Sequence, residues 1–175
     1  MSYPIQTERL SIRPLAMVDL ETFVSYRQDP DIARFQGWET TYSKKQAIDL
    51  IGSQAGLVLP EKGEWLQLAI HSLEHQEHVG DLASKSVEEE DSTFELGFTI
   101  AKQHQGQGFA KEAASKLMSY LGLEAGAQRF VATTDARNIA SIKVLASLGF
   151  KLNTSKGWQE RFKNEEVTVE YFEIS

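Results

Sequence analysis

A change of hydrophobic period between residues 94 and 121 constrains the fold more than any other feature of this sequence. Apolar residues first alternate with polar ones, as in a half-buried strand, at Phe94, Leu96, Phe98 and Ile100. Apolar residues then recur at helical spacing, at Ala110, Ala113, Ala114, Leu117, Met118 and Leu121. Gly106 and Gly108 stand in the turn between the two patterns. A strand that passes through a glycine turn into a helix with one apolar face predicts helices packed on a sheet.

The rest of the chain continues this alternation of strands and helices. Ser43 and Gln46 form a capping box that predicts the start of a helix. Asp19 is placed to cap an earlier helix that Pro30 ends or resets, and Gly149 is placed to end a later one. The long helix is predicted to end at Gly122. Period-two segments predict an edge strand over 9–15, a three-strand antiparallel meander from 65 to 100, and further strands over 129–134, 150–152 and 167–174.

These elements together predict an α+β fold. Its three layers are a mixed, largely antiparallel central sheet of about seven strands and helices on both faces of that sheet. Hydrophobic residues at 41% and charged residues at 25% are ordinary for a globular protein. We therefore expect a single domain over residues 1–175.

Charge and cysteine content exclude several classes of function. Lys and Arg number 18 and Asp and Glu 25, so the net charge of −7 gives no general attraction for nucleic acid or anionic membrane. The sequence has no cysteine, which excludes disulfides and thiolate zinc sites and favours a reducing, cytoplasmic compartment. No signal peptide opens the sequence, and no stretch approaches the ~20 apolar residues of a membrane span. We expect a monomer or a homodimer.

The glycine turn, residues 103–110, is the first candidate functional site. Gly106 and Gly108 have no Cβ, so backbone N–H groups can face a ligand, and the helix N-terminus adds partial positive charge. Three or four charge-assisted bonds of ~1.5–3 kcal/mol each would hold a pyrophosphate with ~5–10 kcal/mol. A Rossmann fingerprint needs a glycine or alanine where this chain has Lys111, and no Walker-type Gly-Lys-Ser/Thr follows the turn. The turn therefore predicts an anion cradle of another kind.

The residues of this turn resemble a known family. Gln103-His104-Gln105-Gly106-Gln107-Gly108 is similar to the Q/R-x-x-G-x-G/A motif of the GNAT superfamily of N-acetyltransferases, where it binds the pyrophosphate of acetyl-coenzyme A. Segment 138–150 resembles the N-x-x-S…L-G-F block of the branch that contains the ribosomal-protein alanine N-acetyltransferases. Segments 7–20 and 29–38 resemble that branch too, so the similarity covers nearly the whole chain. It implies the GNAT (acyl-CoA N-acyltransferase) fold and an acyltransferase with acetyl-CoA as co-substrate.

The resemblance also implies which residues hold the coenzyme. Backbone groups of Phe98, Thr99 and Ile100 would pair with the pantetheine arm as though it were an added strand. The pyrophosphate would be held by the backbone amides of Gln105, Gly106, Gln107, Gly108, Phe109 and Ala110. Asn138 would hydrogen-bond the pantetheine arm. The strand-and-turn pattern of the sequence is consistent with this binding mode, because a strand that ends at an anion cradle leaves an edge where an extended arm can pair.

Acetyl transfer needs an acid for the leaving thiolate and a base for the attacking amine. Many GNAT enzymes carry a tyrosine seven residues after the asparagine, where this chain has Leu145. Ser141 resembles the serine proposed as the acid in this branch; the alternative is a hydroxyl that bonds the helix backbone. Glu95 is the candidate base, acting directly or through water, because it precedes the cradle on the strand. The alternative for Glu95 is an outward residue of a half-exposed strand.

The acceptor is predicted from amine chemistry. Only a neutral amine attacks, and reference pKa values leave an α-amine ~10–15% neutral at pH 7 but a lysine side chain only about 0.04%. We therefore expect the N-terminal amine of a protein or peptide, followed by a small amine such as a polyamine, amino acid or antibiotic. The competing hypothesis is a non-catalytic acyl-CoA-binding module of the same fold, which Leu145 keeps open.

Two further features of the sequence have alternative interpretations. Trp38 is a candidate acceptor-binding residue or else a core aromatic. His71, His75 and His78 surround one predicted turn. Because no cysteine or further ligand pattern accompanies the histidines, we expect them to be solvated turn residues and expect no metal site.

Overall fold

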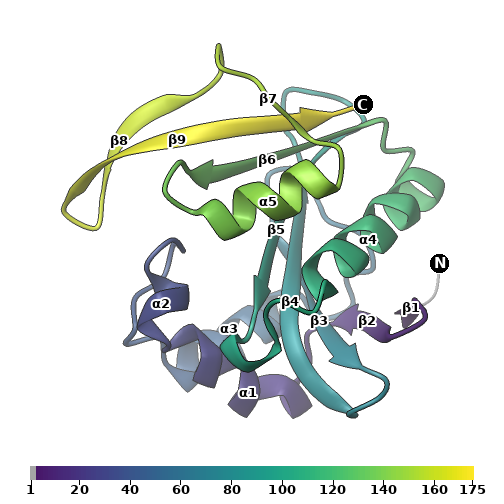
Figure 1. Ribbon diagram of the computed structural model, residues 1–175. Coiled ribbons are helices and arrows are strands. Elements are labelled where there is room, and N and C mark those ends of the chain that lie inside the picture. Colours follow the sequence, from purple (N-terminus) through teal and green to yellow (C-terminus); the bar gives the residue numbers. More distant parts are fainter. Residues whose placement is uncertain (1–2) are drawn as a thin grey trace.

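A nine-stranded sheet runs through the structure, a computed structural model that describes residues 3–175 (Figure 1). Its strands are β1 Ile5–Gln6, β2 Leu10–Pro14, β3 Leu66–Ser72, β4 Glu77–Ser86, β5 Thr93–Ile100, β6 Arg129–Asp135, β7 Lys151–Leu152, β8 Trp158–Phe162 and β9 Glu165–Ile174. The strand order is β1-β2-β3-β4-β5-β6-β9-β7, and β8 pairs with β9. Every neighbouring pair is antiparallel except β5 and β6, which are parallel. This one parallel pair lies at the centre of the sheet and positions the site.

Helices cover both faces of the sheet. They are α1 Leu20–Arg27, α2 Pro30–Ala33, α3 Lys44–Ser53, α4 Phe109–Ala125 and α5 Ile139–Ser147, with short 3-10 turns η1 Met17–Asp19 and η2 Lys102–His104. Figure 1 shows α4 and α5 together on one face, while α1 and α3 lie on the other. Within the described residues, no helix is long and apolar enough to cross a membrane.

The core is divided between the two faces, as the alternating pattern predicts. The larger cluster packs α4 and α5 against the sheet and includes Phe94, Leu96, Phe109, Leu117 and Leu145. The second cluster packs α1, α2 and α3 against the other face and includes Phe23, Tyr26, Ile32, Tyr42 and Ala47. The predicted three-layer α+β fold is therefore confirmed.

Several local predictions are confirmed by the geometry. The Ser43–Gln46 capping box is formed at the start of α3. Pro30 resets the helix, because it is the first residue of α2, and Asp29 caps that turn through the Asp31 amide. Gly149 has a φ of 91°, the left-handed conformation expected after α5.

Other local predictions are wrong. The long helix does not end at Gly122 but continues to Ala125 and ends at Gly126, whose φ is 67°. The strand at 9–15 is not the sheet edge, because β1 pairs outside it. Asp19 precedes α1 but its side chain makes no cap bond to that helix, and its carboxylate accepts from the Ala16 amide at 2.9 Å instead. The sheet has nine strands rather than about seven, because β1 and β8 were not anticipated.

Candidate active site

The parallel strands β5 and β6 separate part-way along their length. They are paired only at Thr93–Glu95 and 129–131. Beyond that point β5 continues to Ile100 with β4 on its other side, and β6 continues to Asp135 with β9 on its other side (Figure 1). Among residues 3–175, no strand therefore pairs with this edge of β5 from Leu96 to Ile100. An extended chain that carries amide groups can hydrogen-bond along such an edge.

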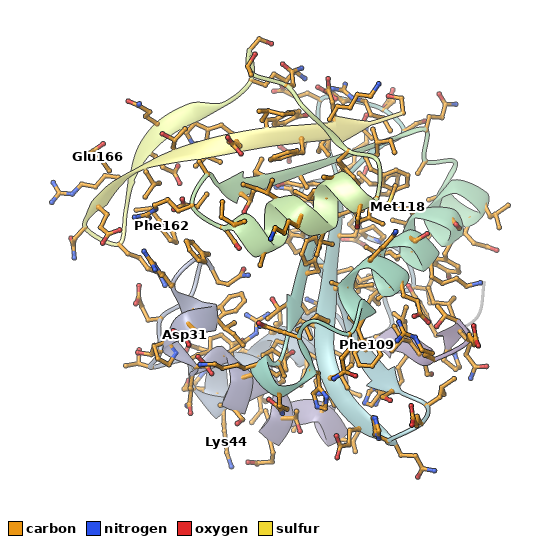
Figure 2. All side chains as sticks on the ribbon, in the orientation of Figure 1. Asp31, Lys44, Phe109, Met118, Phe162 and Glu166 are labelled. Carbon is orange, nitrogen blue, oxygen red and sulfur yellow. The ribbon has the colours of Figure 1, made fainter. Side chains whose placement is uncertain are left out.

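A cavity of about 650 Å³ occupies the opening between these strands. Its walls come from both faces of the sheet. Phe109 and Leu145, which line it, belong to the α4–α5 core cluster, whereas Ile32 belongs to the cluster under α1. Figure 2 shows Phe109 at the first turn of α4 and Asp31, another lining residue, on α2. The cavity is thus lined by residues that pack on both faces of the sheet.

The glycine turn has the conformation of the predicted cradle, except that the Gln105 amide is not free, because it donates to the Lys102 carbonyl at 3.3 Å. Gly106 and Gly108 have φ values of 77° and 81°, so both adopt the left-handed conformation that favours glycine. Within residues 3–175, the successive backbone amides from Gly106 to Lys111 donate to no acceptor. Unpaired amides at the start of a 17-residue helix are the arrangement by which helix N-termini bind anions, so the turn is a candidate anion site.

Ion pairing holds the cradle from behind. The guanidinium of Arg9 donates to the Glu112 carboxylate at 2.7 Å and to the Gln107 carbonyl at 3.1 Å. The Arg9 guanidinium also lies 4.9 Å from the centre of the Phe109 ring. Burial alone would raise the pKa of Glu112, but hydrogen bonds from Thr7 and Arg9 outweigh it and keep that pKa below its usual value. Glu112 therefore anchors the turn as a carboxylate.

Ten of the predicted site residues line the cavity: Phe98, Thr99, Ile100, Gln105, Gly106, Gly108, Phe109, Ala110, Asn138 and Ser141. Glu95, Gln107 and Trp38 do not. The carbonyl of Ile100 already accepts the Gln105 side chain at 2.9 Å, so this backbone group is occupied. Lining the cavity does not test what these residues bind, so their roles in holding the coenzyme stay predictions.

Asn138 and Ser141 lie together at the start of α5. The Asn138 side-chain oxygen accepts from the Ser141 amide at 3.2 Å, which caps the helix. The amide NH₂ of Asn138 and the hydroxyl of Ser141 have no protein partner in the described part of the chain. Both groups therefore remain available to a ligand in the cavity.

Glu95 lies at the last paired position before the opening. Its carboxylate is 2.9 Å from the Lys85 ammonium and 3.4 Å from the hydroxyl of Thr133, which lines the cavity. The side chain of Glu95 is 18% exposed. Glu95 is thus one contact removed from the cavity wall, and its role as a base stays a prediction.

Trp38 lies in the core cluster under α1. Its ring stacks 3.7 Å from the Arg27 guanidinium, and its indole N–H donates to the Arg27 carbonyl. The neighbouring residues Phe35 and Gln36 line the cavity instead. The sequence did not predict this, because the direction in which Phe35 and Gln36 point depends on how the short helix α2 packs. Thr133 and Thr134 were missed too, although their position at the end of the strand before Asn138 was a usable signal.

Two of the three histidines are not solvated turn residues, contrary to expectation. His71 on β3 and His78 on β4 stack with ring centres 5.1 Å apart, and His78 is only 8% exposed. Within the described residues, Asp19, His71 and His78 bring potential metal ligands within 4.8 Å of one another. Both Asp19 oxygens, however, accept from Arg13 at 2.8 and 2.9 Å. The Asp19 carboxylate also lies 2.9 Å from the His71 ring nitrogen, so in this structure it belongs to a network of ion-paired and hydrogen-bonded side chains.

Comparison with known proteins identifies the family. The profile of the acetyltransferase (GNAT) domain matches residues 9–151. The chain belongs to the GNAT acetyltransferase family. An uncharacterised N-acetyltransferase, p20 of Bacillus licheniformis, is 28% identical over 170 residues, which span 97% of this chain and 94% of that protein.

Solved structures of acetyltransferases share the fold of this GNAT protein. The spermidine N-acetyltransferase of Vibrio cholerae, in complex with CoA and spermine, superposes with a TM-score of 0.81 at 16% identity, covering 96% of each chain. RimL, the ribosomal L7/L12 α-N-protein acetyltransferase, in complex with coenzyme A, also gives a TM-score of 0.81 at 16% identity, covering 99% of this chain and 97% of RimL. At this identity the likeness concerns the fold, so it does not select between the two acceptors.

In this GNAT protein, the position of the usual tyrosine is apolar. Leu145 is 1% exposed and belongs to the main core cluster, although it also lines the cavity. A leucine cannot donate a proton. Any protonation of a leaving group at this wall must therefore come from another residue or from water.

Proposed function

We propose that this protein moves an acetyl group from acetyl-CoA to a primary amine by direct transfer in a ternary complex. The observation that carries the proposal is the cavity lined from both faces of the sheet. The cradle at the start of α4 would hold the pyrophosphate, and the free β5 edge would pair with the pantetheine arm. The amine would then enter from the α2 side. No covalent acyl-enzyme is needed, because both substrates reach the reaction centre together.

We assign proton transfer to two side chains. The neutral amine attacks the thioester carbonyl carbon, the C–S bond breaks, and the thiolate leaves. Ser141, whose hydroxyl is free in the described structure, would protonate the thiolate. Glu95 would take the amine proton, directly or through a water beside Thr133.

The proposed acceptor is the N-terminal amine of a protein or peptide. Support comes from the higher neutral fraction of an α-amine at neutral pH and from the fold shared with RimL, which acts on a ribosomal protein. A polyamine is the second candidate. The net charge of −7 and the equal fold likeness to a spermidine N-acetyltransferase favour it.

One pair of peptides tests the acceptor class. A basic peptide that begins with Ala or Ser is compared with the same peptide carrying a blocked N-terminus and free lysines. We expect initial rates of coenzyme A release to differ by about a hundredfold or more, because reference pKa values favour a neutral α-amine over a neutral lysine by several hundredfold.

Spermidine and an aminoglycoside serve as the other arms of this assay. Activity on these amines with neither peptide modified would transfer the function to small amines. Equal rates for the two peptides would indicate a lysine acceptor. Binding of acetyl-CoA without release of coenzyme A on any amine would favour the non-catalytic module.

A further inference from the structure

Most cationic side chains of this acidic protein are already paired with carboxylates. Lys102 illustrates this on the cavity wall, where its ammonium is paired with Asp31. Two other lysines line the cavity, Lys111 and Lys143. Within residues 3–175, neither has a carboxylate or any other polar partner. Both side chains are exposed.

These two lysines face the cavity from different helices. Lys111 lies in the first turn of α4, three residues beyond Gly108 of the cradle. Lys143 lies on α5, five residues beyond Asn138, and Ser147 lines the same cavity one turn later. The two lysines therefore line one cavity from two helices, and Lys111 belongs to the same first helical turn as the cradle.

An anionic ligand needs such unpaired cations. A protein with a net charge of −7 repels anions at long range, so local positive charge must compensate. A lysine that is already paired with a carboxylate has no free charge to offer, whereas Lys111 and Lys143 do. The cradle amides account for a pyrophosphate, which leaves these lysines for a second phosphate group.

We infer that Lys111 and Lys143 bind the 3′-phosphate of coenzyme A. The protein thereby binds acetyl-CoA more tightly than an acyl donor that has the same pantetheine arm but lacks the 3′-phosphate. This inference rests on the acetyl-CoA donor of the proposed function but not on its acceptor or on Glu95 and Ser141.

A neighbouring groove offers a different location for a phosphate. This groove, about 530 Å³, lies on the other side of the α4 N-terminus and shares Gly108 and Lys111 with the cavity. It also contains Arg9 and Lys116. Arg9 is neutralised by Glu112, with which it forms an ion pair, so the groove adds only Lys116 to the shared lysine. Groove and cavity therefore carry equal numbers of unpaired lysines among the described residues, but only the cavity is also lined by the β5 edge along which the pantetheine arm would lie. We therefore assign the phosphate to the cavity.

Calorimetric titration with coenzyme A and with 3′-dephospho-coenzyme A tests the inference. We expect wild type to bind coenzyme A at least about tenfold more tightly, which corresponds to about 1.4 kcal/mol. The Lys111→Ala/Lys143→Ala double variant should reduce this ratio below about twofold, since both ligands keep the pyrophosphate. Lys116→Ala is the control, because it removes a lysine of α4 that lines the groove and not the cavity, and it should leave the ratio unchanged.

The outcomes separate this inference from the proposed function. Equal affinity of wild type for the two ligands, or an unchanged ratio in the double variant, overturns the role of the lysines while the donor stays acetyl-CoA. If Lys116→Ala abolishes the preference for coenzyme A over 3′-dephospho-coenzyme A, the phosphate binds in the groove and the assignment to the cavity is wrong. Absence of coenzyme A binding to wild type overturns the donor itself. Retention of the ratio by Lys111→Arg/Lys143→Arg would support charge as the cause.

Discussion

Two serines on α5 differ in what their hydroxyls do. Both Ser141 and Ser147 line the cavity. The Ser147 hydroxyl donates to the Val144 carbonyl at 2.7 Å, which occupies its proton within the helix. The Ser141 hydroxyl has no partner among the described residues, and only its backbone amide is held, by Asn138. A free hydroxyl at a fixed backbone position is what a proton donor to a ligand requires.

Ser141→Ala is therefore expected to lower kcat by about 10²-fold or more while acetyl-CoA affinity stays nearly constant, in line with typical general-acid contributions. Steady-state kinetics with calorimetry measures both quantities. Ser147→Ala is the matched control, because it removes a hydroxyl from the same helix and cavity, and it should retain kcat. Unchanged turnover in Ser141→Ala would mean that water protonates the thiolate.

The same assay on Glu95→Gln tests the base, and full activity there would remove Glu95 from the mechanism.

At the scale of elements, the junction between β2 and α1 depends on a buried carboxylate. Asp19 is 2% exposed and joins Arg13 on β2 to His71 on β3. Burial by itself raises the pKa of Asp19, but hydrogen bonds from His71, Arg13 and the Ala16 amide outweigh it, so the pKa lies well below its usual value. The ionised carboxylate therefore stabilises the folded state.

The sign of this effect predicts an acid dependence. With a folded-state pKa below the unfolded value of about 3.9, the contribution of Asp19 is fully present above about pH 5 and is lost as the pH falls. Asp19→Asn should lower the free energy of unfolding by about 1.5–3 kcal/mol at neutral pH. The difference from wild type should shrink as pH falls below about 4. Urea unfolding at several pH values measures it, and a difference that stays constant with pH would contradict the assignment.

The sequence predicted those elements whose residues alternate or recur strictly. Strand β5 and helix α4 carry unbroken apolar patterns, so both were found together with the cradle between them. Strand β8 was missed because four of its five residues are exposed, which leaves no apolar alternation to detect. The end of α4 was misplaced because Gly122 is tolerated inside a helix anchored by Leu117 and Leu121.

The candidate site was predicted where it depends on local sequence and missed where it depends on distant packing. The cradle amides and Asn138 follow from local turn and cap chemistry. Phe35 enters the cavity wall only because α2 packs beneath the opening between β5 and β6. The unpaired state of Lys111 and Lys143 likewise depends on where every carboxylate of the fold lies, so it could not be read from the sequence.

At the scale of the whole molecule, the proposed function assigns two ligands of opposite charge to the two faces of the sheet. An anionic donor would enter beside α4 and α5, where Lys111 and Lys143 are unpaired. A cationic acceptor would enter on the α2 side, drawn to the protein by its net charge of −7.

This division predicts that salt weakens capture of a cationic acceptor. With acetyl-CoA saturating, kcat/KM for a basic peptide should fall about tenfold between low and high ionic strength, because salt shortens the Debye length from ~10 Å at 0.1 M to ~3 Å at 1 M. A peptide with the same first residues but no further charge is the control, and its rate should change little. Because both peptides react through the same α-amine, only long-range attraction separates them. An equal loss for the two peptides would show that salt acts on the donor or on folding, and the acidic field would then have no part in acceptor choice.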